Sequence, residues 1–158
     1  MPGQGTGDRG EGTEGPRELL IPPKIYQGIV DHCQSLYPKE ACGILAGPND
    51  PTAGQRRAVV HVYRMTNTED SPIGYAMDPK EQLKVEKEMR QRGQRMIGIY
   101  HSHTASAAYP SSVDVSLAIS PDLSYVLVSF KDRARPELKS YAIDGQRVVV
   151  EPVQVDAA

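Results

Sequence analysis

The sequence predicts a single domain of the α/β (α+β) class, in which a central β-sheet is flanked by helices. The chain has 158 residues and is 39% hydrophobic, which is enough for one core and too short for two comfortable domains. Short apolar runs bounded by turn residues recur along the chain, and segments with helical periodicity interrupt them. Asp144-Gly145, between two of the apolar runs, is a strong signal for a two-residue β-hairpin.

Composition excludes several classes of protein. Residues 1–16 are rich in glycine and charge and lack the apolar segment of a secretory signal, so they predict a disordered tail before a domain spanning residues 17–158. The net charge of -2 gives no electrostatic reason to expect nucleic acid or an anionic membrane as a partner. No segment approaches the roughly 20 apolar residues that span a bilayer. With only Cys33 and Cys42, a disulfide framework or Cys-rich zinc site is not expected, and we predict a reduced, cytoplasmic protein.

The first half of the chain alternates between strands and a helix. After an apolar run at 19–21, Pro23 near the first helical position predicts a helix to about Leu36. Neighbours on a helix point about 100 degrees apart, so Asp31-His32-Cys33 is expected to be two surface residues and a core cysteine, not a catalytic group. Residues 40–47 predict a buried strand with Glu40 at its start, and 58–63 another strand, with His61 in a polar or interfacial position. A turn-rich link at 48–54 separates them.

The second half continues the pattern. Residues 65–72 predict a polar loop, and 74–77 a short extended piece before a helix. Asp78 is that helix's expected N-cap, and its body, 80–92, has a solvated charged face over contacts from Leu83, Val85 and Met89. Further predicted elements are a strand reaching 101–103, a helix at 112–119, and strands at 125–130, 137–143 and 147–150.

A candidate metal site follows from the segment 99–114. His101 and His103 are two residues apart at the end of a predicted strand, so both imidazoles should project from one face and Ser102 from the other. Asp114, in the first turn of the next helix, can fold back to add an oxygen ligand. Two histidines and one carboxylate leave a fourth tetrahedral position open, as in catalytic zinc sites. The simpler alternative is two ordinary strand histidines and a capping box formed by Ser111 and Asp114.

These residues also resemble a known signature. His101-x-His103, seven residues, Ser111, two residues and Asp114, with Glu40 upstream at a strand start, is similar to the motif of the JAMM (MPN+, JAB1/MPN/Mov34) zinc metalloproteases. Segments 38–47, 65–72, 81–85, 100–105 and 125–129 resemble the small bacterial branch that contains the Mec-type peptidases, and the likeness covers about residues 19–153. Thr104 stands where many members carry proline, a difference that is typical of this branch.

The resemblance implies a fold, a metal and an activity. The fold would be a single MPN/JAB domain with a mixed central sheet flanked by helices, in a cytidine-deaminase-like arrangement. His101, His103 and Asp114 would bind one Zn²⁺, Glu40 would act as general base and acid, and Ser111 would donate a hydrogen bond to the tetrahedral oxyanion.

The implied substrate is a ubiquitin-like sulfur-carrier protein whose C-terminal Gly-Gly tail is joined to cysteine. Hydrolysis would release cysteine for cysteine biosynthesis. Two alternatives stay open: processing or deconjugation of another ubiquitin-like modifier by an isopeptidase, and a non-catalytic MPN interaction module. The oligomeric state also stays open, with a homodimer among the options.

Overall fold

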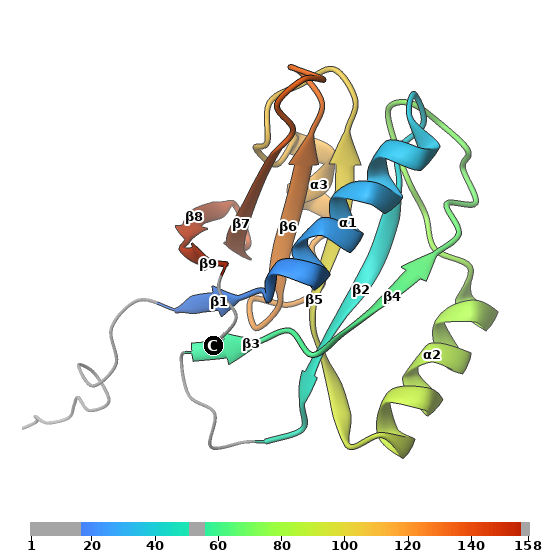
Figure 1. The fold of residues 1–158 in the computed structure, drawn as a ribbon, viewed down its shortest axis with the longest axis vertical. Coiled ribbons are helices and arrows are strands. Elements are labelled where there is room, and N and C mark those ends of the chain that lie inside the picture. The colour runs from blue at the N-terminus through green and yellow to red at the C-terminus, as the bar shows by residue number, and fades with distance from the viewer. Residues whose placement is uncertain (1–16, 51–55, 156–158) are drawn as a thin grey trace, which may run out of the picture.

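A six-stranded mixed sheet forms the centre of the protein, in a computed structural model that describes residues 17–50 and 56–155 (Figure 1). The strand order is β4-β2-β5-β6-β7-β8. Neighbouring strands are antiparallel except β5 and β6, which are parallel. The strands are β2 (Cys42–Pro48), β4 (His61–Met65), β5 (Gln94–His103), β6 (Ser124–Ser129), β7 (Glu137–Asp144) and β8 (Arg147–Glu151). The predicted mixed sheet is confirmed, whereas the tail predicted for 1–16 and most of the link at 48–54 lie outside the described residues.

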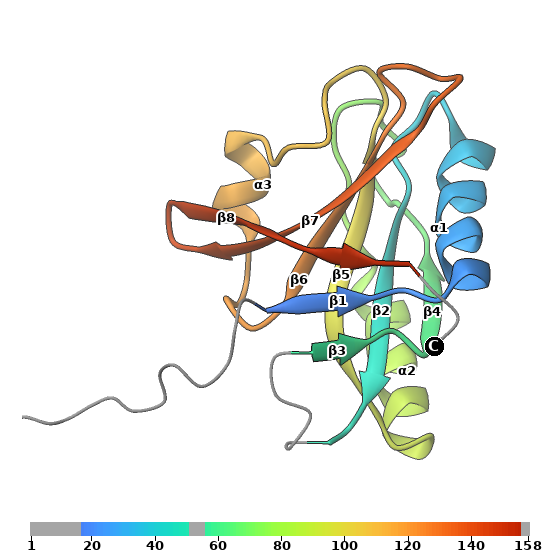
Figure 2. The same ribbon diagram turned by 60° about the vertical axis from the view of Figure 1, so that its left-hand side comes forward.

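Helices cover both faces of this sheet, as Figures 1 and 2 show for α1 (Pro23–Leu36) on one side and α3 (Ser112–Leu117) on the other. Alternation along β2 explains the two faces, because successive side chains of a strand point in opposite directions. Leu45 packs in the core beneath α1. Ile44 and Ala46 pack with the helix α2 (Pro79–Gln91) on the opposite face. None of the described helices is long and apolar enough to cross a membrane.

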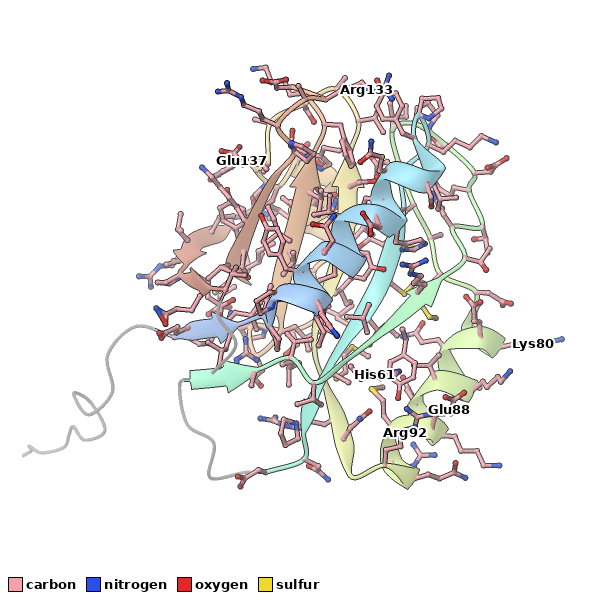
Figure 3. The ribbon with its side chains drawn as sticks, viewed as in Figure 1. His61, Lys80, Glu88, Arg92, Arg133 and Glu137 are labelled. Atoms are coloured by element: carbon pink, nitrogen blue, oxygen red, sulfur yellow. The ribbon has the colours of Figure 1, made fainter. Side chains whose placement is uncertain are left out.

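The helix α2 presents a charged surface to solvent, and Figure 3 shows Lys80 extending away from the sheet. Val85 and Met89 are buried one helical turn apart, as predicted. Leu83 was expected beneath the helix with them, but its side chain is 67% exposed. The reason is geometric. Residues separated by two positions on a helix point about 200 degrees apart, so Leu83 faces away from Val85.

A second, three-stranded parallel sheet lies beside the first, in the order β3-β1-β9. It consists of β1 (Glu18–Leu20), β3 (Arg56–Ala58) and β9 (Val153–Gln154). The single strand predicted for 58–63 is therefore wrong, because the chain changes sheets at Val59-Val60. The Val59 N–H donates to Leu20 O (2.9 Å) and the Val60 N–H to Ala46 O (2.8 Å). Both valines have high strand propensity, so the sequence pattern carries no mark of the break.

A buried carboxylate joins the two sheets. Glu151, at the end of β8, is 3% exposed and accepts hydrogen bonds from Arg17 Nε (2.8 Å) and Arg57 Nη2 (3.2 Å). Its second oxygen accepts from Ser140 Oγ (2.7 Å) on β7. The negative charge is thus fully paired, and the small sheet is fixed against the end of the large one.

The prediction of a surface His32 is wrong. His32 is 7% exposed, and its Nδ1 lies 2.6 Å from the hydroxyl of Tyr100 on β5. Burial, together with the charge of Arg64, lowers the pKa of His32 to about 4, so the ring is neutral. Asp31 is exposed and Cys33 buried, as predicted. Helical position alone cannot reveal a buried polar partner on a distant strand.

One predicted turn is confirmed and one predicted helix end is wrong. The β7–β8 hairpin is confirmed, with Gly145 in the left-handed region at φ +62°. The helix predicted for 112–119 ends earlier, at Leu117. The N–H groups of Ile119 and Ser120 instead donate to the Tyr125 hydroxyl, both at 3.0 Å, so the backbone leaves the helix without losing its partners.

Gly43 on β2 is required by the position of Tyr100. A Cβ at residue 43 would lie 2.1 Å from the ring carbon Cε1 of Tyr100. We expect Gly43→Ala to lower the free energy of unfolding by about 1–3 kcal/mol or more, because the buried ring cannot move without disturbing the core. Urea unfolding measures this.

Gly28, in α1, provides the matched control, because a Cβ there meets no atom within 4 Å. Gly28→Ala is expected to raise stability by about 0.5–1 kcal/mol, since alanine is the better helix former. Equal stability of the two variants would contradict the close packing of Tyr100 on Gly43.

Candidate metal centre and cleft

Two histidines at the end of β5 form the base of the site. His101 and His103 are each 5% exposed, and their Nε2 atoms lie 3.3 Å apart. Ser102, between them, points to the opposite face, where it is fully buried, as the strand period predicts. The Nδ1 atom of His103 lies 2.9 Å from Ala107 O. Because a carbonyl only accepts hydrogen bonds, Nδ1 carries a proton, and Nε2 is the ring nitrogen that faces His101 and Asp114.

Asp114, in the first turn of α3, completes the group. Its Oδ1 lies 3.2 Å from His101 Nε2, and its Oδ2 lies 3.0 Å from His103 Nε2. One ligand atom from each of the three residues lies within 4.8 Å of the others. Asp114 also forms a capping box with Ser111: the Ser111 N–H donates to Oδ2 (2.8 Å), and the Asp114 N–H donates to Ser111 Oγ (3.0 Å). The helix cap and the candidate ligand cluster share Asp114, so the presence of the cap does not exclude the metal site.

The pKa shifts of the three residues differ in direction. Burial lowers the pKa of His101, which favours the neutral ring. Burial also acts to lower the pKa of His103, but hydrogen bonds with Asp114 and Ala107 O outweigh it and raise that pKa. Burial opposes ionisation of Asp114, but hydrogen bonds with His101 and His103 hold the pKa of its carboxyl well below the ordinary value. Two imidazole nitrogens and a carboxylate converge, and a set of nitrogen and oxygen donors of this kind fits Zn²⁺.

Glu40 lies beside this cluster because of strand register. Cys42 pairs with His101 across β2 and β5, so continuing the antiparallel register places Glu40 opposite His103, on the same face of the sheet. The side chain is 7% exposed. Burial raises the pKa of Glu40 to about 7, although the neighbouring charge of His103 opposes the shift. A carboxyl group with a pKa near neutrality can both accept and donate a proton.

The cluster opens into a cleft of about 630 Å³. One side is formed by the loop between β4 and α2, and the other by the loop after β5 together with α3. Ile73 on the first side is 88% exposed, and Val113 and Leu117 on α3 are 61% and 59% exposed. The cleft thus combines a polar floor with an apolar rim. Its lining comprises Glu40, Glu69, Pro72, Ile73, Gly74, Tyr75, His103, Thr104, Ala105, Ser106, Ser111, Val113, Asp114 and Leu117.

Sequence reasoning did not assign the loop between β4 and α2 to the site. Tyr75, on this loop, stacks on His101 with ring centroids 4.5 Å apart and planes inclined by 27°. Thr104, directly after His103, donates a hydrogen bond to Pro72 O (3.1 Å) and so joins the two sides of the cleft. A polar composition identifies residues 65–72 as a loop, but it does not show where the loop folds. His61 is half-buried on β4, with its ring against Tyr63, and is not part of the cluster.

Comparisons with known proteins cover most of the chain. The family model described as prokaryotic homologs of the JAB domain matches residues 22–144. The CysO-cysteine peptidase of Mycobacterium tuberculosis is 47% identical over 137 residues, which are 87% of this chain and 90% of that protein. The desampylase of Haloferax volcanii is 32% identical over 93 residues, 58% of this chain and 63% of that protein. Among solved structures, the solution structure of a Desulfitobacterium hafniense protein matches with a TM-score of 0.79 and 36% identity, covering 89% of this chain and 94% of the other.

Proposed function

This chain belongs to the prokaryotic JAB-domain family, and from that premise we propose that it is a zinc-dependent peptidase. Its proposed substrate is a ubiquitin-like sulfur-carrier protein whose C-terminal glycine is bonded to cysteine, and its product is cysteine for biosynthesis. The observation that carries the proposal is the cluster of His101, His103 and Asp114. Two of its members, His103 and Asp114, line the same cleft as Glu40. A non-catalytic module of this fold would have no need of that set.

His101, His103 and Asp114 are the residues that would hold the metal. Zn²⁺ bound there would supply Lewis-acid activation of water and of the scissile carbonyl. The protein's own contribution is rigidity: β5 lies between two paired strands, and the capping box of α3 fixes the Asp114 carboxylate. The hydrogen bond from His103 to Ala107 O orients the ring, as outer partners of metal-binding histidines commonly do.

Glu40 is proposed as the group that moves the proton. As a carboxylate it would accept a proton from the attacking water, and as an acid it would return that proton to the leaving amine of cysteine. The pKa of about 7 supports both roles, because each protonation state is populated near neutral pH. Glu40 is not among the three clustered ligand residues, so it is free to act on the proton.

Ser111 is proposed as a hydrogen-bond donor to the oxyanion. Its Oγ accepts the Asp114 N–H at 3.0 Å, but a hydroxyl has two lone pairs and one proton, so the donor remains available. Ser111 also lines the cleft. The residue can therefore cap the helix and stabilise developing negative charge at the same time.

Ser111→Ala is expected to reduce kcat by roughly 10²- to 10³-fold if the hydroxyl serves the oxyanion. The lost cap should also lower the free energy of unfolding by about 1 kcal/mol. Steady-state kinetics and urea unfolding measure the two effects. Asp78→Ala is the matched control, because Asp78 caps α2 by accepting the Lys80 N–H at 3.2 Å and does not line the cleft. If kcat falls no further in Ser111→Ala than in Asp78→Ala, Ser111 is a helix cap and not an oxyanion donor.

The substrate assignment is supported by the cleft and by the relatives. An extended Gly-Gly tail has no side chains, so main-chain hydrogen bonds to the cleft edge would bind it. The 47% identity to a CysO-cysteine peptidase favours cysteine as the released group. The similarity to desampylases and to a probable TtuB-protein conjugate cleaving protease of Thermus thermophilus favours, as the second candidate, removal of a ubiquitin-like modifier from a protein.

The two candidates are distinguished by their products. We would incubate the zinc-loaded protein with a carrier–cysteine adduct and, separately, with the same carrier linked to a lysine side chain. We expect the carrier–cysteine adduct to yield free cysteine and a carrier protein that ends in Gly-Gly. Conversion of the lysine conjugate alone would favour the second candidate.

A further inference from the structure

The peptide group between Glu40 and Ala41 is held at both ends by side chains. The Glu40 carbonyl accepts a hydrogen bond from Asn67 Nδ2 (2.9 Å), and the Ala41 N–H donates to Ser102 Oγ (2.8 Å). The backbone on either side is also fixed: the Glu40 N–H donates to Ser71 O (2.8 Å), and the Ser102 N–H donates to Ala41 O (3.1 Å). The peptide group is planar, and its C=O and its N–H are both hydrogen-bonded to side chains. It therefore cannot rotate without breaking one of these two hydrogen bonds.

Ser102 connects this peptide to the metal ligands. It lies on β5 between His101 and His103, fully buried on the opposite face of the sheet. Its hydroxyl and its backbone N–H both bond Ala41, so the residue after Glu40 is fixed directly to the strand that carries the two histidines. The separation between Glu40 and those ligands is therefore set by two short contacts.

Asn67 connects the same peptide to the loop between β4 and α2. Its amide uses its full hydrogen-bonding capacity: Nδ2 donates to Glu40 O and Gly74 O (both 2.9 Å), and Oδ1 accepts from the Glu69 and Ala76 N–H groups (both 3.0 Å). Gly74 and Ala76 flank Tyr75, whose ring stacks on His101. One half-buried amide thus sets the place of Glu40 and of a wall of the cleft together.

We propose that Asn67 and Ser102 are positioning residues for the reaction. Their hydrogen bonds to the Glu40–Ala41 peptide hold the Glu40 carboxyl at its place beside His101 and His103. The inference rests on the proposed role of Glu40 in proton transfer. A displacement of about 1 Å in a reacting group can lower a rate about 10²-fold. Loss of the hydrogen bonds from either residue should therefore reduce kcat while the metal ligands stay in place.

Four variants separate positioning from general loop stability. Asn67→Asp keeps the two acceptor bonds of the loop but loses both Nδ2 donors, and Asn67→Ala loses all four without adding charge. Ser102→Ala removes the acceptor of the Ala41 N–H. Thr68→Val is the matched control, because it removes a loop hydrogen bond, Thr68 Oγ1 to Ala76 O (3.1 Å), that does not reach Glu40.

The readouts are kcat, KM and zinc content, measured below the thermal transition of each variant. We expect kcat to fall about 10²-fold in both Asn67 variants and in Ser102→Ala, with zinc content within about twofold of wild type. KM should stay within about twofold in Ser102→Ala and should rise in the Asn67 variants, because these also lose the hydrogen bond to the cleft wall at Gly74. Thr68→Val should stay within about twofold in all three. Combining Asn67→Ala with Glu40→Gln should add little further loss, because residues that act as a unit are not additive. A wild-type kcat in Asn67→Asp and Ser102→Ala, or a loss that parallels zinc loss, would overturn the inference.

A second measurement does not need turnover. If wild-type protein releases no cysteine from the adduct, the proposed function fails, and hydrogen exchange at the Ala41 amide still tests its hydrogen bond to Ser102. Faster exchange at this amide in Ser102→Ala than in Thr68→Val supports the inference. Equal protection in the two variants would contradict it, whatever the activity.

Discussion

Replacing Glu40 with glutamine is expected to lower kcat by about 10²- to 10⁴-fold, the range that a positioned general base contributes. Glutamine has nearly the same shape, but its amide cannot accept and return a proton at neutral pH. Because Glu40 is not one of the three clustered ligand residues, zinc binding should be unchanged. Steady-state kinetics on the carrier–cysteine adduct, with elemental analysis of the same samples, measures both quantities.

Glu88→Gln is the matched control for this substitution. Glu88 lies on α2, as Figure 3 shows, and is not among the residues that line the cleft. The control should keep both wild-type kcat and wild-type zinc content. Comparable activity in Glu40→Gln and Glu88→Gln would remove Glu40 from the mechanism, and zinc loss in Glu40→Gln would instead indicate that it is a ligand.

Asp114→Ala is expected to abolish stable zinc binding and, with it, turnover. Without the carboxylate, two neutral imidazoles remain, which is one ligand fewer than catalytic zinc sites ordinarily have. The Asp114 oxygens lie 3.2 Å and 3.0 Å from the two histidine Nε2 atoms, so both imidazoles lose a direct neighbour. Zinc content after gel filtration, measured by elemental analysis, reports the loss independently of activity.

The capping box must be separated from ligation in this variant. Asp114→Ala also removes the acceptor of the Ser111 N–H, and the cap is worth about 1 kcal/mol of stability. Ser111→Ala disrupts the same cap while keeping the carboxylate, so it should retain zinc. Full zinc occupancy in Asp114→Ala would disprove the ligand assignment, and equal zinc loss in both variants would attribute the effect to the cap.

Local sequence patterns predicted the parts of the fold and site that depend on nearby residues. His101, His103 and Asp114 lie within one strand, loop and helix start, so the two-residue strand period and the helix-start signals were sufficient to propose that they meet. The β7–β8 hairpin followed from a two-residue turn for the same reason. Glu40 entered as a catalytic candidate through family resemblance, and the strand register places it opposite His103.

What the sequence did not predict depends on contacts between distant segments. The small parallel sheet is made of strands only two or three residues long, too short to carry a period, and its pairing joins the two ends of the described chain. The burial of His32 depends on a hydroxyl on β5, and the role of Asn67 depends on how a loop of polar composition folds over Glu40. Each of these contacts satisfies one buried polar group, and the periodicity of the sequence does not predict such individual contacts.

We propose that His101, His103, Asp114 and Glu40 form one zinc-dependent hydrolytic centre. The most direct test is a zinc titration of the metal-free protein, with cysteine release from the carrier–cysteine adduct followed at each addition. The rate should rise in proportion to zinc, reach a plateau at one zinc per chain, and return to the background when a chelator is added. Hydrolysis by the metal-free protein at the rate of the zinc-loaded protein would contradict it.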